Sequence, residues 1–187
     1  AGAARSSTKV SNEYAASAGV QLPWLSATAD AAWHPSGGDW QYKGIVNLQH
    51  SWGALTPSLK ISTRYRPQAE KENLRTDIRF DLDGSWGELQ AHLRVNALRC
   101  VSWGWLGYAE AGWKGDASLW LRATVFDIGS WADRIYVYER DVPGSFNVPA
   151  YYGKGYSLAL FAAWKELRLR LATTRYPGWS KSPSWEL

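Results

Sequence analysis

Hydrophobic and polar positions alternate along residues 75–83 and again along 88–97, with the turn-forming stretch 84–87 between the two arms. Successive side chains of a β-strand leave opposite faces of the sheet, so a period of two indicates a strand on each arm. A glycine-containing turn between two such strands is typical of a β-hairpin. One face of the predicted hairpin is almost entirely apolar, whereas the other carries charged and amide side chains.

The same period of two recurs along most of the chain, and no helical period of 3.6 is found. The further predicted strands cover about 9–22, 25–34, 41–52, 59–66, 105–114, 118–125, 157–165 and 167–171, and another begins near 185. Consecutive strands joined by short turns form an antiparallel meander, and closure into a barrel hides its edges. We therefore predict one all-β domain over residues 1–187, an antiparallel up-and-down β-barrel of about ten or more strands.

Aromatic residues indicate which face of this barrel points outward. A soluble barrel buries its apolar face, whereas a transmembrane barrel shows that face to lipid and keeps a polar lumen. The predicted strands have the length of roughly 9–11 residues that crosses a bilayer when tilted. The chain has 13 Trp and 10 Tyr, and many lie near strand ends, where membrane barrels carry their aromatic girdles. The predicted girdle consists of Trp24, Trp33, Trp52, Tyr65, Trp86, Trp105, Trp113 and Trp164, with Trp40 and Tyr176 in similar positions.

Charges of both signs occupy the polar face of the strands. Opposite charges that pair across strands reduce the cost of desolvation in a crowded lumen. The predicted lumen network consists of Lys60, Arg64, Arg66, Arg75, Asp77, Arg79, Asp81, Glu88, His92, Arg94, Arg168 and Arg170. We therefore predict a transmembrane barrel with a polar lumen and an apolar outer face, in the bacterial outer membrane with the lipid bilayer as its partner. A soluble ligand-binding barrel is the alternative.

Composition excludes several other classes of protein. The formal net charge is only +4, and the interleaved signs form no basic stripe, so we expect no nucleic-acid partner. No stretch approaches the 18 apolar residues of a membrane-spanning helix. The chain has no Met and its start lacks the apolar core of a signal peptide. We therefore expect a processed product or a piece of a longer chain.

Candidate catalytic and metal-binding residues are few. Cys100 is the single cysteine, which excludes an internal disulfide and a cysteine-based metal site. None of His34, His50 and His92 lies beside a Gly-x-Ser-x-Gly elbow or a second ligand at metal spacing. Asp77, Asp81 and Asp83 alternate with arginines, which favours salt bridges over calcium. We predict no catalytic, cofactor or metal site, with a membrane-embedded hydrolase dependent on His92 as a minor alternative.

Residues 128–154 form the one long predicted connection, and connections of this length are usually functional or covering loops. A short extended piece is expected near 134–139, and prolines and a glycine interrupt the remainder. The tyrosines of this loop are suited either to stacking on a sugar or partner, or to packing over the barrel mouth, which we favour: Tyr136, Tyr138, Tyr151 and Tyr152.

Five segments in the second half of the chain carry a resemblance to a known family. They are residues 107–110, 121–127, 134–143, 146–155 and 173–176. Together they resemble the C-terminal part of Bacteroidetes-type proteins to which helix-hairpin-helix domains are assigned, whose later portion looks like an outer-membrane β-barrel. The family usually closes with one more amphipathic strand, whereas this chain stops at Leu187. No helical hairpin of the DNA-binding kind is found here, and the resemblance implies a fold and a place in the envelope but no catalytic residue.

The predicted function is that of a structural or anchoring subunit of a cell-envelope assembly, without enzymatic activity. Other outer-membrane proteins are the expected partners. The first alternative is an outer-membrane channel or transporter for a solute or polymer, gated by residues 128–154. About ten strands leave little interior room once side chains fill the lumen, which favours the structural role.

Overall fold

A computed structural model of the chain describes residues 14–34, 39–140, 147–177 and 184–186. Eleven strands form one sheet and two further strands form a small hairpin. The sheet contains β1 (Tyr14–Gln21), β2 (Leu25–His34), β3 (Asp39–Gln49), β4 (Leu55–Tyr65), β5 (Leu74–Trp86), β6 (Leu89–Arg99), β7 (Trp103–Lys114), β8 (Ala117–Ile128), β11 (Gly153–Trp164), β12 (Leu167–Arg175) and β13 (Ser184–Glu186). The hairpin contains β9 (Ile135–Tyr136) and β10 (Ala150–Tyr151). The prediction of an all-β antiparallel fold is confirmed.

The hairpin predicted at 75–97 is β5 and β6, and its geometry follows from the alternating pattern. Trp86 lies opposite Leu89 at the turn, and Arg79 lies opposite Asn96 in the middle. Gly87 has a φ of 62°, a conformation that glycine adopts without the steric cost of a side chain. The predicted residues 9–13 of the first strand and the side chain of His34 lie outside the part of the chain that the structure describes.

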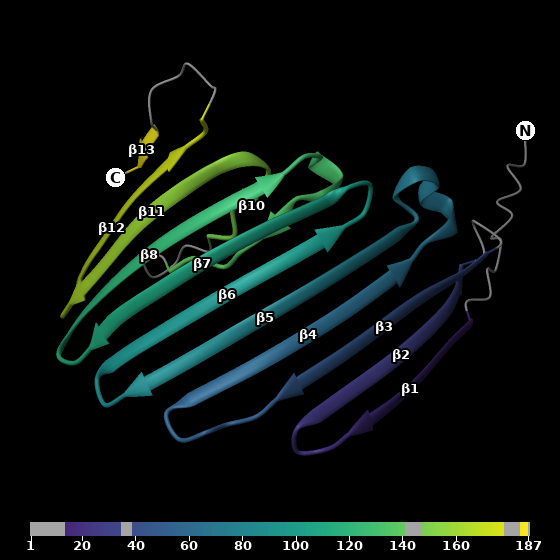
Figure 1. Cartoon of the computed structure of the whole chain (residues 1–187), viewed down its shortest axis with the longest axis horizontal. Helices are drawn as coiled ribbons and strands as arrows, with labels where there is room; N and C mark the ends of the chain where they lie inside the picture. Colours follow the sequence, from purple (N-terminus) through teal and green to yellow (C-terminus); the bar gives the residue numbers. More distant parts are fainter. Residues whose placement is uncertain (1–13, 35–38, 141–146, 178–183, 187) are drawn as a thin grey trace, which may run out of the picture.

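Strands that are neighbours in sequence are also neighbours in the sheet, except that β8 pairs with β11. Short turns connect the strands at one end of the sheet (the short-turn end), for example between β7 and β8 (Figure 1). The opposite end (the long-loop end) carries the longer connections, which include 3-10 helices at Pro67–Glu72 and Trp131–Asp133. No helix in the described ranges is long and apolar enough to cross a membrane.

The two edge strands lie at opposite margins of the sheet. Figure 1 shows β1 at one margin and β12 with β13 at the other. Among the described strands β1 pairs with β2 alone, and β13 pairs with β12 alone. The structure therefore establishes the antiparallel meander, whereas the described strands do not establish the closure into a barrel that the sequence predicts.

The connection between β8 and β11 lies against one face of the sheet, which we call the inner face; the opposite face is the outer face. Buried apolar side chains from β6, β7 and β8 pack against this connection at the long-loop end. The cluster consists of Leu98, Leu106, Tyr108, Phe126, Ile128, Ile135, Val137 and Tyr151. The inner face is therefore apolar at this end, where Ile135, Val137 and Tyr151 of the connection pack on it.

Candidate functional site

The outer face is apolar across ten strands. Many of its large side chains are exposed, for example on β6 and β8, where Leu93 is 39%, Val125 is 48% and Leu121 is 56% accessible. The register assigns every second residue of each strand to this face. Among the described outer positions, charged residues occur only at the long-loop end: Arg99, Asp127, Lys154 and Arg175.

Tryptophans border this apolar face at the short-turn end. All five are about half exposed or more: Trp24 52%, Trp52 65%, Trp86 49%, Trp113 53% and Trp164 53%. Each lies at the end of a strand or in the adjoining turn. Indole rings favour such positions when one part of the ring meets hydrocarbon and the N–H meets water.

A second border of aromatic residues lies at the long-loop end. It consists of Trp33, Trp40, Tyr42, Tyr65, Trp103, Trp105 and Tyr156. The structure thus places all eight predicted girdle residues at outer positions near strand ends. Sequence reasoning missed Tyr42, Trp103 and Tyr156, although the alternation of residues 39–49, 103–114 and 153–164 carries the signal.

Both borders run diagonally across the strands. We call residues of one face that lie directly opposite one another on neighbouring strands a row, so that successive rows of a face are two residues apart along each strand. At the long-loop end, Trp33 and Trp40 share a row. Tyr42 and Tyr65 share the next row toward the short-turn end. The border then moves one row further in this direction at each step. The subsequent rows contain Trp103 with Arg99, then Trp105 with Asp127 and Lys154, then Tyr156 with Arg175.

From β4 to β11, the border at the short-turn end shifts in the same direction, toward the turns. Trp52 pairs with Leu55, whose row contains Gly84. Trp86 and Trp113 lie one row further toward the turns, and Trp164 lies one row beyond them. A band of constant width that crosses strands at a slant is expected where strands tilt relative to a membrane, as in β-barrels.

The inner face holds a compact charge network around Asp81, which is only 4% exposed. The Arg79 Nε lies 2.9 Å from one Asp81 oxygen, and the Arg94 Nε donates to the other. His92 lies between Asp81, at 3.3 Å from its Nε2, and Asp83, which contacts its Nδ1. Buried charges need such partners, because an unpaired one costs several kcal/mol.

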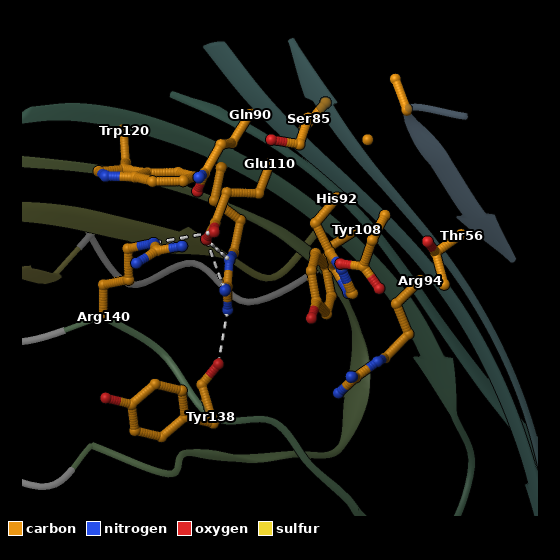
Figure 2. A pocket seen from close by; sticks show the side chains of 15 residues that line it. Thr56, Ser85, Gln90, His92, Arg94, Tyr108, Glu110, Trp120, Tyr138 and Arg140 are labelled. Carbon is orange, nitrogen blue, oxygen red and sulfur yellow. Dashed lines mark hydrogen bonds and ion pairs between the residues drawn. The ribbon is translucent and has the colours of Figure 1, made fainter. Parts of the chain in front are cut away.

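A second network surrounds Glu110, which is 6% exposed. The Arg122 Nε donates to Glu110 at 2.8 Å, and the Arg140 Nε donates to the other oxygen at 2.9 Å (Figure 2). The Arg122 guanidinium also stacks 4.3 Å from the Tyr108 ring centroid, and that of Arg140 lies 3.4 Å from the Trp120 centroid. Because Arg140 belongs to the connection, this network ties β7 and β8 to residues 129–152.

Some predicted lumen charges do not pair as the sequence suggests. The register places Lys60 opposite Arg79 and Arg64 opposite Arg75, so like charges face each other there. Asp77 instead accepts a hydrogen bond from the Asn96 amide at 3.1 Å. Opposite-charge pairing across strands is therefore confined to other rows, such as Asp81 with Arg94 and Glu110 with Arg122.

Three other predicted network members lie at strand ends or in turns. Arg66 precedes the 3-10 helix at Pro67–Glu72, Glu88 lies in the turn between β5 and β6, and both are exposed. Arg168 is also exposed, and its guanidinium donates to the backbone carbonyls of Lys165 and Leu167. Their position at strand ends or in turns was not visible in the sequence, because strand parity alone does not show where a strand ends.

Asp133 anchors the connection at the long-loop end. Its side chain is fully buried and accepts hydrogen bonds from the backbone N–H groups of Cys100, Val101 and Ser102 and from the Ser102 hydroxyl, at 2.5 to 3.0 Å. Burial alone favours the neutral acid, but the bonds from Ser102, Cys100 and Val101 together lower the pKa of Asp133. Sequence reasoning missed this residue.

Further contacts hold the connection on the inner face. Arg75 donates to the carbonyls of Ala132 and Arg134 at 3.1 and 3.2 Å. Glu139 accepts from Arg170 at 2.9 Å and also from the Tyr151 hydroxyl. Burial, then the Glu139 charge, raises the pKa of Tyr151. The other predicted loop tyrosines are exposed: Tyr136 52%, Tyr138 56% and Tyr152 40%.

A pocket of about 390 Å³ lies on the inner face between the two charge networks (Figure 2). Its lining includes Asp83, Gln90, His92, Tyr108 and Arg140. The partners of His92 in this pocket are carboxylates and the stacked Tyr108 ring at 5.3 Å, not a serine hydroxyl. No group of three or more potential metal ligands occurs in the described part of the chain.

The comparisons with known proteins add no relative. Searches against protein-family models, curated proteins and solved structures return no match for this chain. The resemblance to Bacteroidetes-type outer-membrane proteins therefore stays a prediction.

Proposed function

We propose that this chain forms a transmembrane β-barrel of the bacterial outer membrane and serves as a structural or anchoring subunit of an envelope assembly, with residues 129–152 inside the lumen. The observation that carries the proposal is the charge-free outer band between two slanted aromatic borders. Lipid contact explains this band, because a charged side chain that faces hydrocarbon is destabilising. The resemblance to Bacteroidetes-type barrels points to the same fold and location.

The width of the band fits a bilayer. About eight residues separate Trp105 from Trp113 on β7, and about eight separate Tyr156 from Trp164 on β11. At roughly 3.3 Å per residue and a tilt of about 40°, they rise about 20 Å. The apolar band of outer-membrane barrels is close to that height, at about 25 Å.

Shallow grooves on the outer face also suit lipid. One groove of about 620 Å³ lies among Trp113, Leu119, Trp164, Leu167 and Leu169. A second, of about 330 Å³, lies among Trp24, Leu48, Leu59 and Phe80. An acyl chain fills such grooves without requiring any hydrogen bond. A soluble barrel, by contrast, would have to leave this surface in water, where large apolar patches cause aggregation.

Closure of the sheet is part of the proposal. An open strand edge leaves backbone N–H and C=O groups unpaired, which is very costly in hydrocarbon. The edge at β1 therefore has to pair with a strand at the opposite margin. The inner charges then enclose a lumen in which Glu110, Arg122 and Arg140 join the wall to the connection.

A matched pair of substitutions tests the membrane assignment. Ile61 is an outer residue, 40% exposed, and Ser62 is its inner neighbour on β4. In phosphatidylcholine vesicles we expect Ile61→Arg to destabilise the folded chain by about 2–4 kcal/mol, the cost of arginine at a lipid-facing site near the midplane. Ser62→Arg should cost less than about 1 kcal/mol, because it faces the polar lumen beside Asp77.

Urea unfolding in vesicles, followed by the shift in gel mobility between folded and heated chain, measures both values. Equal effects of Ile61→Arg and Ser62→Arg would contradict the proposal. A wild-type chain that remains monodisperse and folded in buffer without detergent or lipid would contradict it as well, and would favour a soluble barrel.

A further inference from the structure

The few charges on the outer face lie together at the long-loop end, on strands β6 to β12. Arg99 is at the end of β6, Asp127 is near the end of β8, Lys154 is near the start of β11 and Arg175 ends β12. Three of these four residues are cations, so the strip carries an excess of positive charge. The outer positions of the same strands at the short-turn end carry only apolar and aromatic residues, among them Trp113 and Leu167.

Each of these charges is positioned beside an aromatic residue or a partner on the rim. The Arg99 guanidinium lies 6.0 Å from the Trp103 ring centroid, and Arg175 donates to the Tyr156 hydroxyl at 3.5 Å. Lys154 contacts Asp127 at 3.0 Å, yet its side chain remains 72% exposed. The cations therefore lie at the level of the aromatic border, where long basic side chains reach from the apolar region to the headgroups.

The cations follow the same slant as the aromatic border. Arg99 is one row nearer the long-loop end than the row of Lys154, and Arg175 is one row nearer the short-turn end. For tilted strands this stagger brings the three residues toward a common height in the membrane. Adjacent strands are about 4.8 Å apart, so the strip extends over several headgroups.

We propose that Arg99, Lys154 and Arg175 form a binding strip for phosphate-bearing lipid headgroups in the leaflet at the long-loop end. The proposal rests on the membrane assignment made above and adds a ligand class and an orientation to it. Guanidinium and ammonium groups are the usual ligands of phosphate. Longer connections of outer-membrane barrels face the outside, so the strip belongs to the external leaflet. Asp127 holds Lys154 in place but leaves the strip with a net positive charge.

Lipid retention tests the strip directly. The wild-type chain is folded into phosphatidylcholine vesicles with and without phosphatidic acid, extracted gently, and the lipids that remain bound are counted by native mass spectrometry. We expect wild type to retain phosphatidic acid preferentially. Arg99→Gln, Lys154→Gln and Arg175→Gln combined should lower this preference at least about tenfold, because each cation near an anionic surface contributes roughly fivefold.

A control variant removes the same charge from the inner face. It combines Lys43→Gln, Lys60→Gln and Arg168→Gln, which lie at inner positions of β3, β4 and β12, and should retain the wild-type preference. The inference is overturned if the strip variant keeps its preference or if both variants lose it equally. If wild type folds into neither kind of vesicle, the membrane assignment itself fails and the inference fails with it; folding without a headgroup preference overturns only the inference.

Discussion

At the scale of single residues, Asp133 is a buried carboxylate that depends on its hydrogen-bond donors. Its carboxylate is fully buried and is satisfied by three backbone N–H groups and the Ser102 hydroxyl. Hydrogen bonds to a charged group contribute about 1.5–3 kcal/mol each, and an unsatisfied buried donor is costly. The side chain therefore contributes, together with the contacts of Arg75, Glu110 and Arg170, to how firmly the connection stays on the inner face.

We expect Asp133→Asn to loosen this connection. An amide accepts fewer of these bonds and places its own donors against N–H groups, so the locally open state should become at least about tenfold more populated, equivalent to roughly 1.5 kcal/mol. Trypsin cleavage after Arg134 measures that population when opening is fast. Asp127→Asn, an exposed carboxylate paired with Lys154, is the matched control and should change cleavage little. Unaltered cleavage in Asp133→Asn would argue against the anchoring role.

The hydrogen bonds of Asp133 also predict that opening of the connection depends on pH. The native pKa of Asp133 is lowered, so its contribution is complete above the ordinary aspartate value of about 3.9 and is lost as the pH falls through the lowered value. Pepsin cleavage of wild type and Asp133→Asn should therefore differ at pH 4 and converge as the pH is lowered further. A difference that is independent of pH would show that the ionised form is not responsible.

Residues differ in how far their position and contacts can be predicted from the sequence. The girdle residues were predictable, because a tryptophan at the end of an alternating stretch is visible in one strand alone. Asp133 was not predictable, since its partners at 100–102 lie about 30 residues away and no periodic pattern joins the two places. The contact of Trp120 with Arg140 was not predictable either, because it depends on the path of the connection.

At the scale of secondary-structure elements, close contacts between strands depend on glycine at a few positions. A Cβ on Gly155 would lie 2.5 Å from the Arg175 carbonyl oxygen and 2.8 Å from the Phe126 ring. Arg175 pairs with Tyr156 in the β11–β12 ladder, and a backbone atom yields less readily than the far end of a flexible side chain. On Gly107 a Cβ would meet only the Arg94 carbonyl oxygen, at 3.7 Å, an ordinary contact.

We therefore expect Gly155→Ala to destabilise the folded chain by about 1–3 kcal/mol, the range for overpacking a filled site. Gly107→Ala should stay within about 0.5 kcal/mol of wild type, and its added methyl group faces outward. Urea unfolding of both variants in vesicles gives the two values. Comparable losses at the two positions would indicate that backbone freedom, rather than the contact with Arg175 and Phe126, decides the effect.

Element boundaries and partners were less predictable than element type. Alternation identifies the face of each residue, but the row partner depends on turn length and on pairings that no single strand encodes. Lys60 was predicted as part of a network with charges of both signs, and its row partner on β5 is Arg79. The inner apolar cluster around Leu106 and Phe126 was missed for a related reason, since its partners Ile135 and Val137 come from the connection.

At the scale of the whole molecule, the sequence was sufficient for an antiparallel meander, because local alternation repeats in every strand. It was not sufficient for closure, which depends on the pairing of strands far apart in the chain. The position of the connection on the inner face was not predictable from the sequence either. Ile128 and Gly153 lie directly opposite each other, so β8 and β11 form a continuous pair from which residues 129–152 emerge as an insertion.

In the proposed barrel, this pairing allows the connection to be removed from the lumen without breaking the wall. Replacing residues 129–152 with a short hairpin turn should leave the strands paired and convert a low-conductance barrel into one with a steady open current, several-fold above wild type in planar bilayers. Salt bridges such as Glu110–Arg140 would be lost, so some destabilisation should accompany the change. If wild type already conducts as strongly as the shortened chain, the channel function is favoured over the structural one.

The slant of the two aromatic borders has a consequence for accuracy during assembly. Backbone hydrogen bonds repeat every two residues, so a ladder by itself tolerates a slip of that size without losing its alternation. Such a slip would displace one part of the wall by about 6.6 Å along the strands. In the proposed barrel it would move some aromatic rings away from one membrane–water boundary, and it would move others, such as those of Trp113 or Tyr156, out of the opposite boundary. In the transmembrane barrel proposed above, the membrane would thus select the correct stagger among otherwise equivalent pairings.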